Sequence, residues 1–394
     1  MTTPWIIEPR DPLIFRDGRP IGGNAPIETM NFPYPSTIAG AVRGRMASDT
    51  SGFTLRGRPD QLEALRAIPV RGPLLAQVSS KGDVLDWLFP APRDALVHHA
   101  DPLSIRPLHP QALPQGHRIG GIDERGLLPV GTTEIVTREQ LRVAPALFWR
   151  ADHYLTWLSG QVPVVKSTHD LGVGEFTRDS RMHVVMRKGE RVGEAGGLFE
   201  TVGLRLIEEC EGELRHYAFT VTSPGGMVDG KPLQLRRELA PIGGERRLAR
   251  WWPAPERQRW PDLPPAVCEQ IIRSRRARLI LATPALFNEG ALPAWSGRAW
   301  FHGGPITVTV KAACVPPAEV VSGWDMAADR EKPSRRMAAS GSVYFVHLGG
   351  GDDAALRAWL RATWLHSISD QPEDRRDGFG LAALGVWQEA TPCP

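Results

Sequence analysis

Residues 12–18 read PLIFRDG and residues 284–290 read PALFNEG, so the pattern Pro-x-x-Phe-x-Asp/Glu-Gly occurs twice in the chain. The Pro, Phe and Gly of the first copy each recur 272 residues further on (284 − 12 = 272). An apolar, strand-like segment precedes each copy. A match of four positions in seven can arise by chance, but recurrence in the same local setting indicates an internal duplication. The repeat therefore predicts two related structural units.

Each half of the chain also ends in the same way. A Gly-rich turn flanked by arginines leads into a last strand-like run, as PIGGERRLARWW over 241–252 and as RRDGFGLAALGVW over 375–387. Between these ends, the patterns of each half favour a strand, a helix or its remnant, two strands, a helix and a strand. This is the βαββαβ order of the ferredoxin-like fold, which has an antiparallel sheet with helices on one face.

The sequence thus predicts an α+β protein with tandem ferredoxin-like (RRM-like) domains over 1–260 and 261–394. A Pro-rich stretch over 253–265 suits the linker between them. Residues 48–131 are rich in Pro, Gly and Arg, and we expect them to form a loop-rich insertion with one short helix near 60–67.

Two helices have clear start signals. Residues 33–46 form the first, with Ser36 or Thr37 as its cap, and residues 352–368 form the second, capped by one of its leading aspartates. The segment KPLQLRREL, which begins at Lys231, is expected to open with a further short helix.

The composition is that of a globular protein, since 42% of the 394 residues are hydrophobic and 23% are charged. No apolar run approaches the roughly 18 residues that a membrane span needs. The N-terminus lacks the basic and apolar regions of a signal peptide. The four cysteines lie far apart in the sequence. We therefore expect a cytoplasmic protein with free thiols.

The basic residues are mostly arginine, because only six of the 47 are lysine. Arginine binds phosphates and stacks on bases, but a GC-rich genome also favours it, and both explanations stay open. Arginines gather in small clusters beside Gly, Ser or aromatic residues, a mixture typical of proteins that follow a single nucleic-acid strand. The clusters lie at Arg43/Arg45, Arg178/Arg181, Arg187/Lys188, Arg246/Arg247/Arg250, Arg273/Arg275/Arg276/Arg278 and Arg335/Arg336. Any single cluster is more often a solvated face.

The motifs of common enzyme classes are missing from the sequence. Gly378, Gly380 and Gly385 are spaced GxGxxxxG rather than in the dinucleotide pattern GxGxxG, and no GK[ST], GxSxG or HExxH occurs. We therefore predict no catalytic residue, no metal site and no cofactor. Glycines without a Cβ do let backbone amides approach a phosphate, although a plain tight turn explains this motif equally well.

Seven motifs in a fixed order resemble a known family. They are DPLIFRDGRP, YPSTIAGAVRGRM, RMHVVMRKGERVGEAGGLFETVGLRL, IGGERRLA, RLILATPALF, SGSVYFVHL and DGFGLAALGVW. Together they resemble subunit three of the Cmr effector complex, a RAMP-superfamily protein of type III-B CRISPR systems. The resemblance covers nearly the whole chain outside 48–131 and the linker. Each motif is weak alone, and the ordered set is specific.

The resemblance implies a structural role rather than an activity. In this family, tandem ferredoxin-like domains carry RAMP glycine loops that precede the last strand of each domain. The subunit holds the 5′ repeat-derived handle of the guide RNA (crRNA), without catalysis, in antiviral defence. It docks on the large polymerase/cyclase-like subunit and on the first RAMP backbone subunit.

The resemblance also implies a set of RNA-facing residues, taken by position in the motifs and joined by basic residues of the clusters. They are Ser36, Thr37, Gly40, Arg43, Arg181, Gly243, Gly244, Arg246, Arg247, Arg335, Arg336, Arg376, Gly378 and Gly380. The second glycine loop, GFGLAAL, carries less charge than GGERRLA in the first. This difference leaves open that the second loop faces a protein partner rather than RNA.

Two alternatives remain. A RAMP endoribonuclease that processes precursor guide RNA would need a histidine near the first helix or the glycine loops. None occurs between Met1 and Val97 or between Tyr217 and Phe301, which leaves His169 and His183. The second alternative is the equivalent handle-binding subunit of a type III-A complex, but IGGERRLA and SGSVYFVHL favour type III-B.

Overall fold

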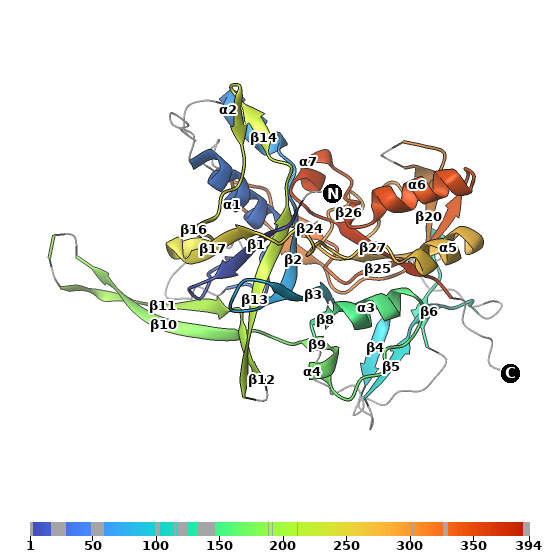
Figure 1. Ribbon diagram of the computed structural model, residues 1–394, viewed down its shortest axis with the longest axis horizontal. Coiled ribbons are helices and arrows are strands. Elements are labelled where there is room, and N and C mark those ends of the chain that lie inside the picture. Colours follow the sequence, from blue (N-terminus) through green and yellow to red (C-terminus); the bar gives the residue numbers. More distant parts are fainter. Residues whose placement is uncertain are drawn as a thin grey trace. The chain divides into compact units, whose positions relative to one another are not determined.

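The structure is a computed structural model that describes residues 3–16, 29–48, 59–98, 103–113, 116, 125–132, 146–187, 189–190, 192–210, 212–300, 303–325 and 330–388. The chain forms two compact units, each built from three chain segments (Figure 1). Unit 1 comprises Met1–Leu85, Glu175–Arg259 and Val320–Arg335, and unit 2 comprises Asp86–Gly174, Trp260–Glu319 and Arg336–Pro394. The chain does pass from one unit to the other at the predicted boundary near 260. However, 86–174 groups with unit 2 and 320–335 with unit 1.

Unit 1 is built on an antiparallel sheet with the strand order β16-β17-β1-β13-β2, in which β12 also pairs with β13. The strands are β1 (Trp5–Pro9), β2 (Arg71–Val78), β12 (Ile207–Cys210), β13 (Glu213–Thr222), β16 (Glu238–Pro241) and β17 (Leu248–Pro253). Helices α1 (Pro35–Ser48) and α2 (Pro59–Ala67) connect β1 to β2. The α1 side chains at positions 38, 42 and 46 are buried, as their helical spacing predicts.

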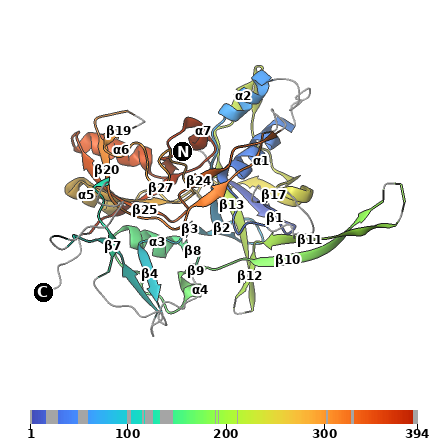
Figure 2. The same ribbon diagram turned by 180° about the vertical axis from the view of Figure 1, so that it is seen from behind.

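A long hairpin and several short elements complete unit 1. The hairpin, β10 (Thr177–Met186) and β11 (Gly193–Arg205), extends well beyond the sheet of its unit (Figures 1 and 2). The short elements are β14 (Gly226–Val228), β15 (Lys231–Leu233), the 3₁₀ turn η2 (Gly244–Arg246), β22 (Trp324–Asp325) and β23 (Arg330–Glu331). Two strands at the segment ends, β21 (Glu319–Val321) and β24 (Arg335–Met337), pair with each other.

Unit 2 is built on a second antiparallel sheet, with the strand order β19-β20-β25-β18-β27-β26. The strands are β18 (Arg276–Leu281), β19 (Arg298–Ala299), β20 (Thr307–Cys314), β25 (Val343–Gly349), β26 (His366–Ser367) and β27 (Leu381–Val386). Its helices here are α5 (Pro265–Ser274), α6 (Asp353–Thr363) and α7 (Pro372–Arg376).

The remaining part of unit 2 comes from the segment 86–174. Its elements are β3 (Val84–Pro90), β4 (Ala95–His98), β5 (Ser104–Pro107), β6 (His109–Pro110), β7 (Val130–Gly131), β8 (Phe148–Arg150), α3 (Ala151–Leu158), α4 (Thr168–Leu171) and β9 (Gly172–Val173). Among the described residues, no helix has the length and apolar character needed to cross a membrane. Cys210, Cys268 and Cys314 are free thiols as expected, and Cys393 lies outside the described residues.

The two sheets share one strand order. When the four main strands of each are numbered along the chain, both run fourth, first, third, second, as β17-β1-β13-β2 in unit 1 and β27-β18-β25-β20 in unit 2. Every neighbouring pair in these two sets is antiparallel. The α+β class with mostly antiparallel sheets, predicted from the sequence, is therefore confirmed.

The repeated motif occupies matching places in the two sheets. Leu13 forms a single bridge to Leu204 in unit 1, and its counterpart Ala285 (13 + 272 = 285) forms one to Ala338 in unit 2. The amide of Arg10 donates to the carbonyl at the start of β17 (2.9 Å), as that of Ala282 does at the start of β27 (2.7 Å). The Asp17-Gly18 end of the first copy lies outside the described residues.

Some elements differ from the expectation. The predicted insertion over 48–131 contributes β2, whose buried side chains stand in the main sheet of unit 1. The segment at Lys231 forms strands rather than a helix, since Pro232 and Pro241 bracket too few residues to offset the cost of nucleating one. Helix α1 begins at Pro35, so Ser36 and Thr37 lie inside its first turn. The aspartate cap of α6 is confirmed, because the Asp352 side chain accepts from the Ala355 amide.

Candidate nucleic-acid interface

The first glycine loop, Gly243–Arg247, lies at the surface of unit 1 and contacts the first copy of the repeated motif. The amide of Gly244 donates to the carbonyl of Ile14 at 2.8 Å. Gly243 has φ 72°, and a Cβ there would stand 2.7 Å from the same carbonyl oxygen and 3.1 Å from the ring of Phe15. The glycine at 243 is therefore required by the fold, because both its backbone conformation and its close approach exclude a side chain.

The backbone of the loop has positive φ values at two residues other than glycine, in addition to Gly243. Glu245 and Arg246 have φ values of 55° and 50°, the left-handed region that side chains other than glycine rarely adopt. Such residues cost of order 1–3 kcal/mol each and persist where their surroundings hold them. Here the amide of Ile242 donates to the carbonyl of Arg247 at 2.8 Å and closes the loop. The bend is thus fixed before any ligand arrives.

The two arginines of the loop differ in burial. Arg246 is exposed and makes no hydrogen bond or ion pair with the residues that the structure describes. Arg247 is half-buried, and its Nε is a buried donor that has no acceptor in the described part of the chain. A buried donor without a partner costs about 1–3 kcal/mol, so this atom would gain from a ligand with an acceptor oxygen.

The base of the β10–β11 hairpin meets the same motif. Leu204 of β11 bridges Leu13, and a Cβ on Gly203 would stand 2.7 Å from the Cβ of Pro12. On β10, Arg178 donates from Nη2 to the Oδ1 of Asn31 at 2.6 Å. These contacts attach the hairpin base both to residues 12–13 and to the segment that leads into α1.

A carboxylate connects the hairpin base to the glycine loop. Arg181 donates from Nε and Nη2 to the two oxygens of Asp179, at 2.8 Å and 3.4 Å. These hydrogen bonds hold the pKa of Asp179 below its usual value, and the positive charges of Arg205 and Arg247 act in the same direction. Guanidinium groups from β10, β11 and the loop therefore all favour the ionised form of one side chain, and that of Arg181 contacts it. The structure thus brings the predicted Arg181 together with the predicted Arg247 of the first glycine loop.

Helix α1 supplies fewer surface groups than predicted. Ser36 and Thr37 are half-buried in its first turn, and Arg43 is buried, where its Nε donates to the carbonyl of Ile68 at 2.9 Å. Gly40 is exposed, and a Cβ there would meet nothing within 4 Å. Arg43 thus braces the chain beyond α2, while Gly40 is a glycine that no contact of the described residues requires.

The second glycine loop, Arg375–Gly380, is built differently. Gly378 and Gly380 are buried, and the amide of Gly380 donates to the carbonyl of Pro284 at 2.7 Å. With φ 78°, a Cβ on Gly380 would stand 2.6 Å from the Oγ of Ser369. Arg376 is half-buried. The two predicted glycines therefore face the interior of unit 2.

The last predicted pair lies apart from either loop. Arg335 and Arg336 are exposed neighbours on β24. Arg278, a member of one of the arginine clusters in the sequence, is buried in unit 2 with 5% of its surface exposed. It donates to the Oδ2 of Asp94 at 2.5 Å. The Nε1 of Trp157 donates to the other oxygen of Asp94 at 2.9 Å, so both oxygens of this buried carboxylate are paired.

Sequence reasoning missed Asp179, Arg205 and Asn31. Asp179 stands two residues from Arg181, which places both on one face of a strand, and this spacing was a readable signal. The approach of Arg205 and Arg247 depends on the register of β10 against β11 and on the path of the loop. Neither is visible in a single sequence.

The histidines that an enzyme would need lie in separate settings. The Nε2 of His183 is 2.9 Å from the Oγ1 of Thr201, and its ring stacks on Phe199. His169 is exposed on α4. In the described ranges, no three His, Cys, Asp or Glu side chains lie close enough to hold a metal ion.

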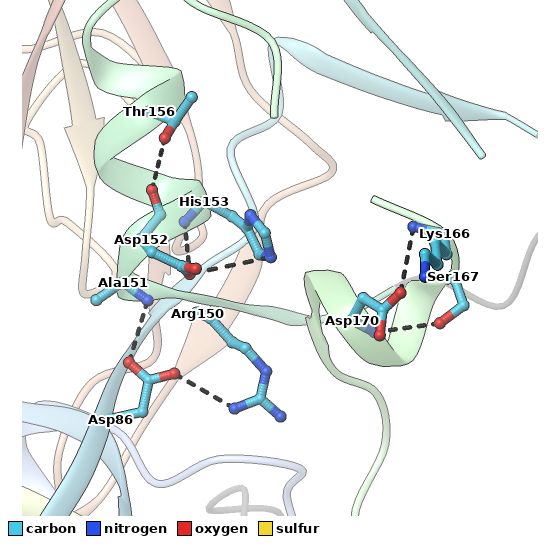
Figure 3. Close-up of polar contacts among 9 residues, drawn as sticks. All are labelled: Asp86, Arg150, Ala151, Asp152, His153, Thr156, Lys166, Ser167 and Asp170. Atoms are coloured by element: carbon cyan, nitrogen blue, oxygen red, sulfur yellow. Dashed lines mark hydrogen bonds and ion pairs between the residues drawn. The ribbon is translucent and has the colours of Figure 1, made fainter. Parts of the chain in front are cut away.

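A denser group of polar side chains surrounds α3 and α4 in unit 2 (Figure 3). Asp86 accepts from the amide of Ala151 at 3.4 Å and from Arg150 at 3.3 Å, and burial raises its pKa. Asp170 accepts from the backbone amide of Lys166 at 3.2 Å. These carboxylates bind backbone amides at and before helix starts, as capping groups do.

The chain was compared with known structures and proteins. Two cryo-EM structures of the Type III-B Cmr-beta contain similar chains, one bound to cognate target RNA and AMPPnP in state 1 and one bound to cognate target RNA. The first is 15% identical over 87% of this chain and 86% of that chain, with a TM-score of 0.44. The second is 14% identical over the same shares, also with a TM-score of 0.44. No curated protein matches the sequence.

The family itself is shown by a sequence model that describes CRISPR-associated proteins named Cas_Cmr3 and matches residues 5–387. The match begins at the first strand of unit 1 and ends just after the last strand of unit 2. It therefore includes both glycine loops and the whole of 48–131. The chain belongs to the Cas_Cmr3 family of CRISPR-associated proteins.

Proposed function

We propose that this protein is a non-catalytic, RNA-binding subunit of a type III-B Cmr effector complex and that it holds the 5′ repeat-derived handle of the guide RNA. Membership of the Cas_Cmr3 family supports the complex. The proposed protein partners are the large polymerase-like subunit and the first RAMP backbone subunit. In this role the chain supplies a surface for RNA and for its neighbours rather than a reaction centre.

One observation carries the RNA-binding part of the proposal. An exposed, pre-bent glycine loop with two arginines lies beside a hairpin base with two more, although these residues come from chain segments far apart in the sequence. Arg181 and Arg205 belong to the hairpin, and Arg246 and Arg247 belong to the loop. Arginine forks match the geometry of phosphate oxygens, and glycines without a Cβ let a nucleotide backbone come close.

The unpaired Nε of Arg247 strengthens this proposal. It is a buried donor without an acceptor among the described residues, and a phosphate oxygen is a strong acceptor. Gly244 belongs to the same loop, where its carbonyl accepts from the amide of Arg247 at 3.4 Å. It has no positive φ, and a Cβ there would have its nearest neighbour at 3.4 Å. The fold therefore tolerates a side chain at 244, and the absence of one suits the close approach of a ligand.

We further propose that the two units are tandem ferredoxin-like domains. Both sheets have the strand order fourth, first, third, second, and all the pairs are antiparallel. Unit 1 has α1 and α2 after its first strand but no α-helix over 223–247, between its third and fourth strands. Unit 2 has α6 before its fourth strand, but the described residues of 282–306 contain no helix. Each copy would then retain a different half of the helical layer.

The second glycine loop has a different proposed role. Its buried glycines and the amide of Gly380 serve contacts inside unit 2. We assign it to the support of the fold, with Arg375, Arg376 and Asp377 half-buried at its start. Contact of this region with a protein partner remains compatible with that role.

The test is guide-RNA binding across a salt series. The full-length chain is reconstituted with its partner subunits and a labelled guide RNA from its own locus. Replacing Arg246 and Arg247 together with Ala should weaken binding and flatten the slope of log affinity against log salt by about 1.4, since each single-strand phosphate contact contributes about 0.7. The matched control is Arg273→Ala with Arg361→Ala, two exposed arginines of α5 and α6. An unchanged slope in a folded Arg246/Arg247 variant would place the RNA site elsewhere.

The proposed lack of activity has its own test. Purified protein is incubated with labelled repeat RNA, with and without divalent metal. We expect no site-specific cleavage. Cleavage that His169→Ala or His183→Ala abolishes would establish the endoribonuclease instead. A tagged copy expressed from the native locus should co-purify with type III-B subunits. Co-purification with type III-A subunits would instead assign the protein to a type III-A complex.

A further inference from the structure

A negatively charged side chain stands inside the basic surface of unit 1. Asp179 lies on β10 with Arg181 two residues further on, so both side chains project from one face of the strand. On β11, Gly203 lies opposite Asp179 and Arg205 lies opposite Thr177. Arg205 is therefore a diagonal neighbour of Asp179 on the same face. One carboxylate thus has two arginines beside it within a single hairpin.

The contact between Asp179 and Arg181 is directional. The guanidinium approaches side-on, with Nε 2.8 Å from Oδ1 and Nη2 3.4 Å from Oδ2. Its Nη1 has no acceptor among the described residues, and the Arg181 side chain is 47% exposed. The pair therefore fixes the plane of the guanidinium while its far edge stays available to solvent or to a ligand.

The glycine loop supplies a third cation. The charge of Arg247 acts on Asp179 along with that of Arg205, after the direct hydrogen bonds from Arg181. These interactions lower the pKa of Asp179, so the group is ionised at neutral pH. Asp11 also acts on Arg181, although less than Asp179 does, and its Oδ2 accepts from the amide of Leu248 at 2.9 Å. Asp179 is thus the acid shared by the three arginines.

We propose that Asp179 is a positioning residue that holds Arg181 in the orientation in which its free edge meets a guide-RNA phosphate, beside Arg205 and Arg247. This inference rests on the proposed RNA-binding function of the first glycine loop. An arginine fork that is already oriented loses less conformational freedom when it binds, which raises affinity without adding a contact. The carboxylate would then increase RNA affinity although its charge has the same sign as RNA.

The direction of the change in RNA affinity distinguishes this proposal from simple repulsion between Asp179 and the phosphates. If Asp179 only repels phosphate, Asp179→Asn should strengthen RNA binding. If Asp179 positions Arg181, the same change should weaken binding roughly fivefold to tenfold, within the usual range of coupling between residues in contact. An exposed ion pair contributes little to folding, so the variant should unfold at nearly the parental temperature.

The experiment is a double-mutant cycle in the reconstituted complex, with a labelled guide RNA that carries the handle and a second RNA that lacks it. The variants are Asp179→Asn, Arg181→Ala, both together, and Arg181→Lys. Arg181→Lys keeps the charge but cannot form the two-point contact, so it should lose about as much affinity as Asp179→Asn. The control is Glu200→Gln, which removes an acid of the same hairpin that bonds Ser180 rather than an arginine. It should bind as tightly as the parent or slightly more so.

Two results support the inference: weaker binding in Asp179→Asn, and no loss or a gain when the same change is made in Arg181→Ala. Stronger binding in both backgrounds, equal weakening in both, or parental binding by Arg181→Lys would each overturn it. If Asp179→Asn fails to fold, the RNA affinity of Arg181→Lys alone tests the inference. The Arg246/Arg247 variant runs in the same series. If that variant responds and Asp179→Asn does not, only this inference fails, whereas if that variant binds as the parent does, the proposed function fails with it.

Discussion

The two glycine loops of this chain look alike in sequence and differ in the structure. Each precedes the last strand of its sheet and contacts the repeated Pro-x-x-Phe motif. In the first loop, Gly243 is exposed and Arg246 extends the basic surface, whereas in the second, Gly378 and Gly380 are buried. The glycines of the first loop permit a bend at the surface, and those of the second permit close packing inside. Glycine thus has a different structural role in each loop, and the charge of the neighbouring residues distinguishes the two loops.

The largest effect on stability is expected at Gly380. In Gly380→Val, the new side chain begins 2.6 Å from the Oγ and 2.9 Å from the amide of Ser369, at a φ of 78°. Strain and overpacking together should cost on the order of 4 kcal/mol. Thermal unfolding of the purified chain measures this. Gly290→Val is the matched control, since Gly290 has φ 79° and open space around it, and it should lose only the strain. Equal losses in the two variants would contradict the packing explanation.

Arg375→Ala should give a smaller loss. Its Nη1 donates to the carbonyls of Ser369 and Asp370, at 2.8 Å and 2.7 Å, and burial lowers its pKa. Removing the guanidinium leaves two carbonyls short of a donor, which should lower the free energy of unfolding by about 1–3 kcal/mol. Arg361→Ala, at an exposed site of α6, is the control for loss of charge. The salt slope of RNA binding should not change in Arg375→Ala, and a flatter slope would make the second loop an RNA contact.

Gly244→Ala should have the smallest effect on stability. The added methyl group would have the Ile14 carbonyl oxygen as its nearest neighbour at 3.4 Å, which is ordinary contact, so we expect a change below about 0.5 kcal/mol. RNA affinity should nevertheless fall, because the methyl group adds bulk to the loop that we propose a nucleotide backbone approaches. Gly131→Ala, where the added methyl group would have its nearest neighbour, the Cγ of Gln111, at 3.8 Å, controls for the substitution itself. A variant that binds guide RNA as tightly as the parent would show that RNA binding does not require a glycine at 244.

Several features could be predicted from the sequence because local chemistry determines them. The offset of 272 residues places Leu13 and Ala285 at matching bridges, and the aspartate before α6 caps it. By contrast, β2 escaped prediction because its short apolar run, PLLAQV, stands in a stretch rich in Pro and Gly. Burial of that strand depends on β13, which follows more than a hundred residues later.

The candidate site was harder to predict than the fold. Arg278 and Arg246 both belong to arginine clusters, yet one is paired inside unit 2 and the other is exposed in a loop. The difference depends on whether each position lies in a central strand or in a loop and on what packs there. The role proposed for Asp179 depends on the register between two strands and on a third segment. Such information lies in tertiary structure, and composition does not contain it.

The interleaving of chain segments has a consequence for synthesis on the ribosome. Unit 1 takes its last segment from Val320–Arg335, and unit 2 starts at Asp86 and ends with Arg336–Pro394. Neither unit can be completed until the final quarter of the chain has emerged from the ribosome. The chain therefore cannot fold in the usual order, in which an N-terminal domain folds first. Most contacts must form between distant segments, which slows folding and leaves strand edges exposed for longer. A cut at residue 260 would therefore yield two incomplete fragments rather than two domains.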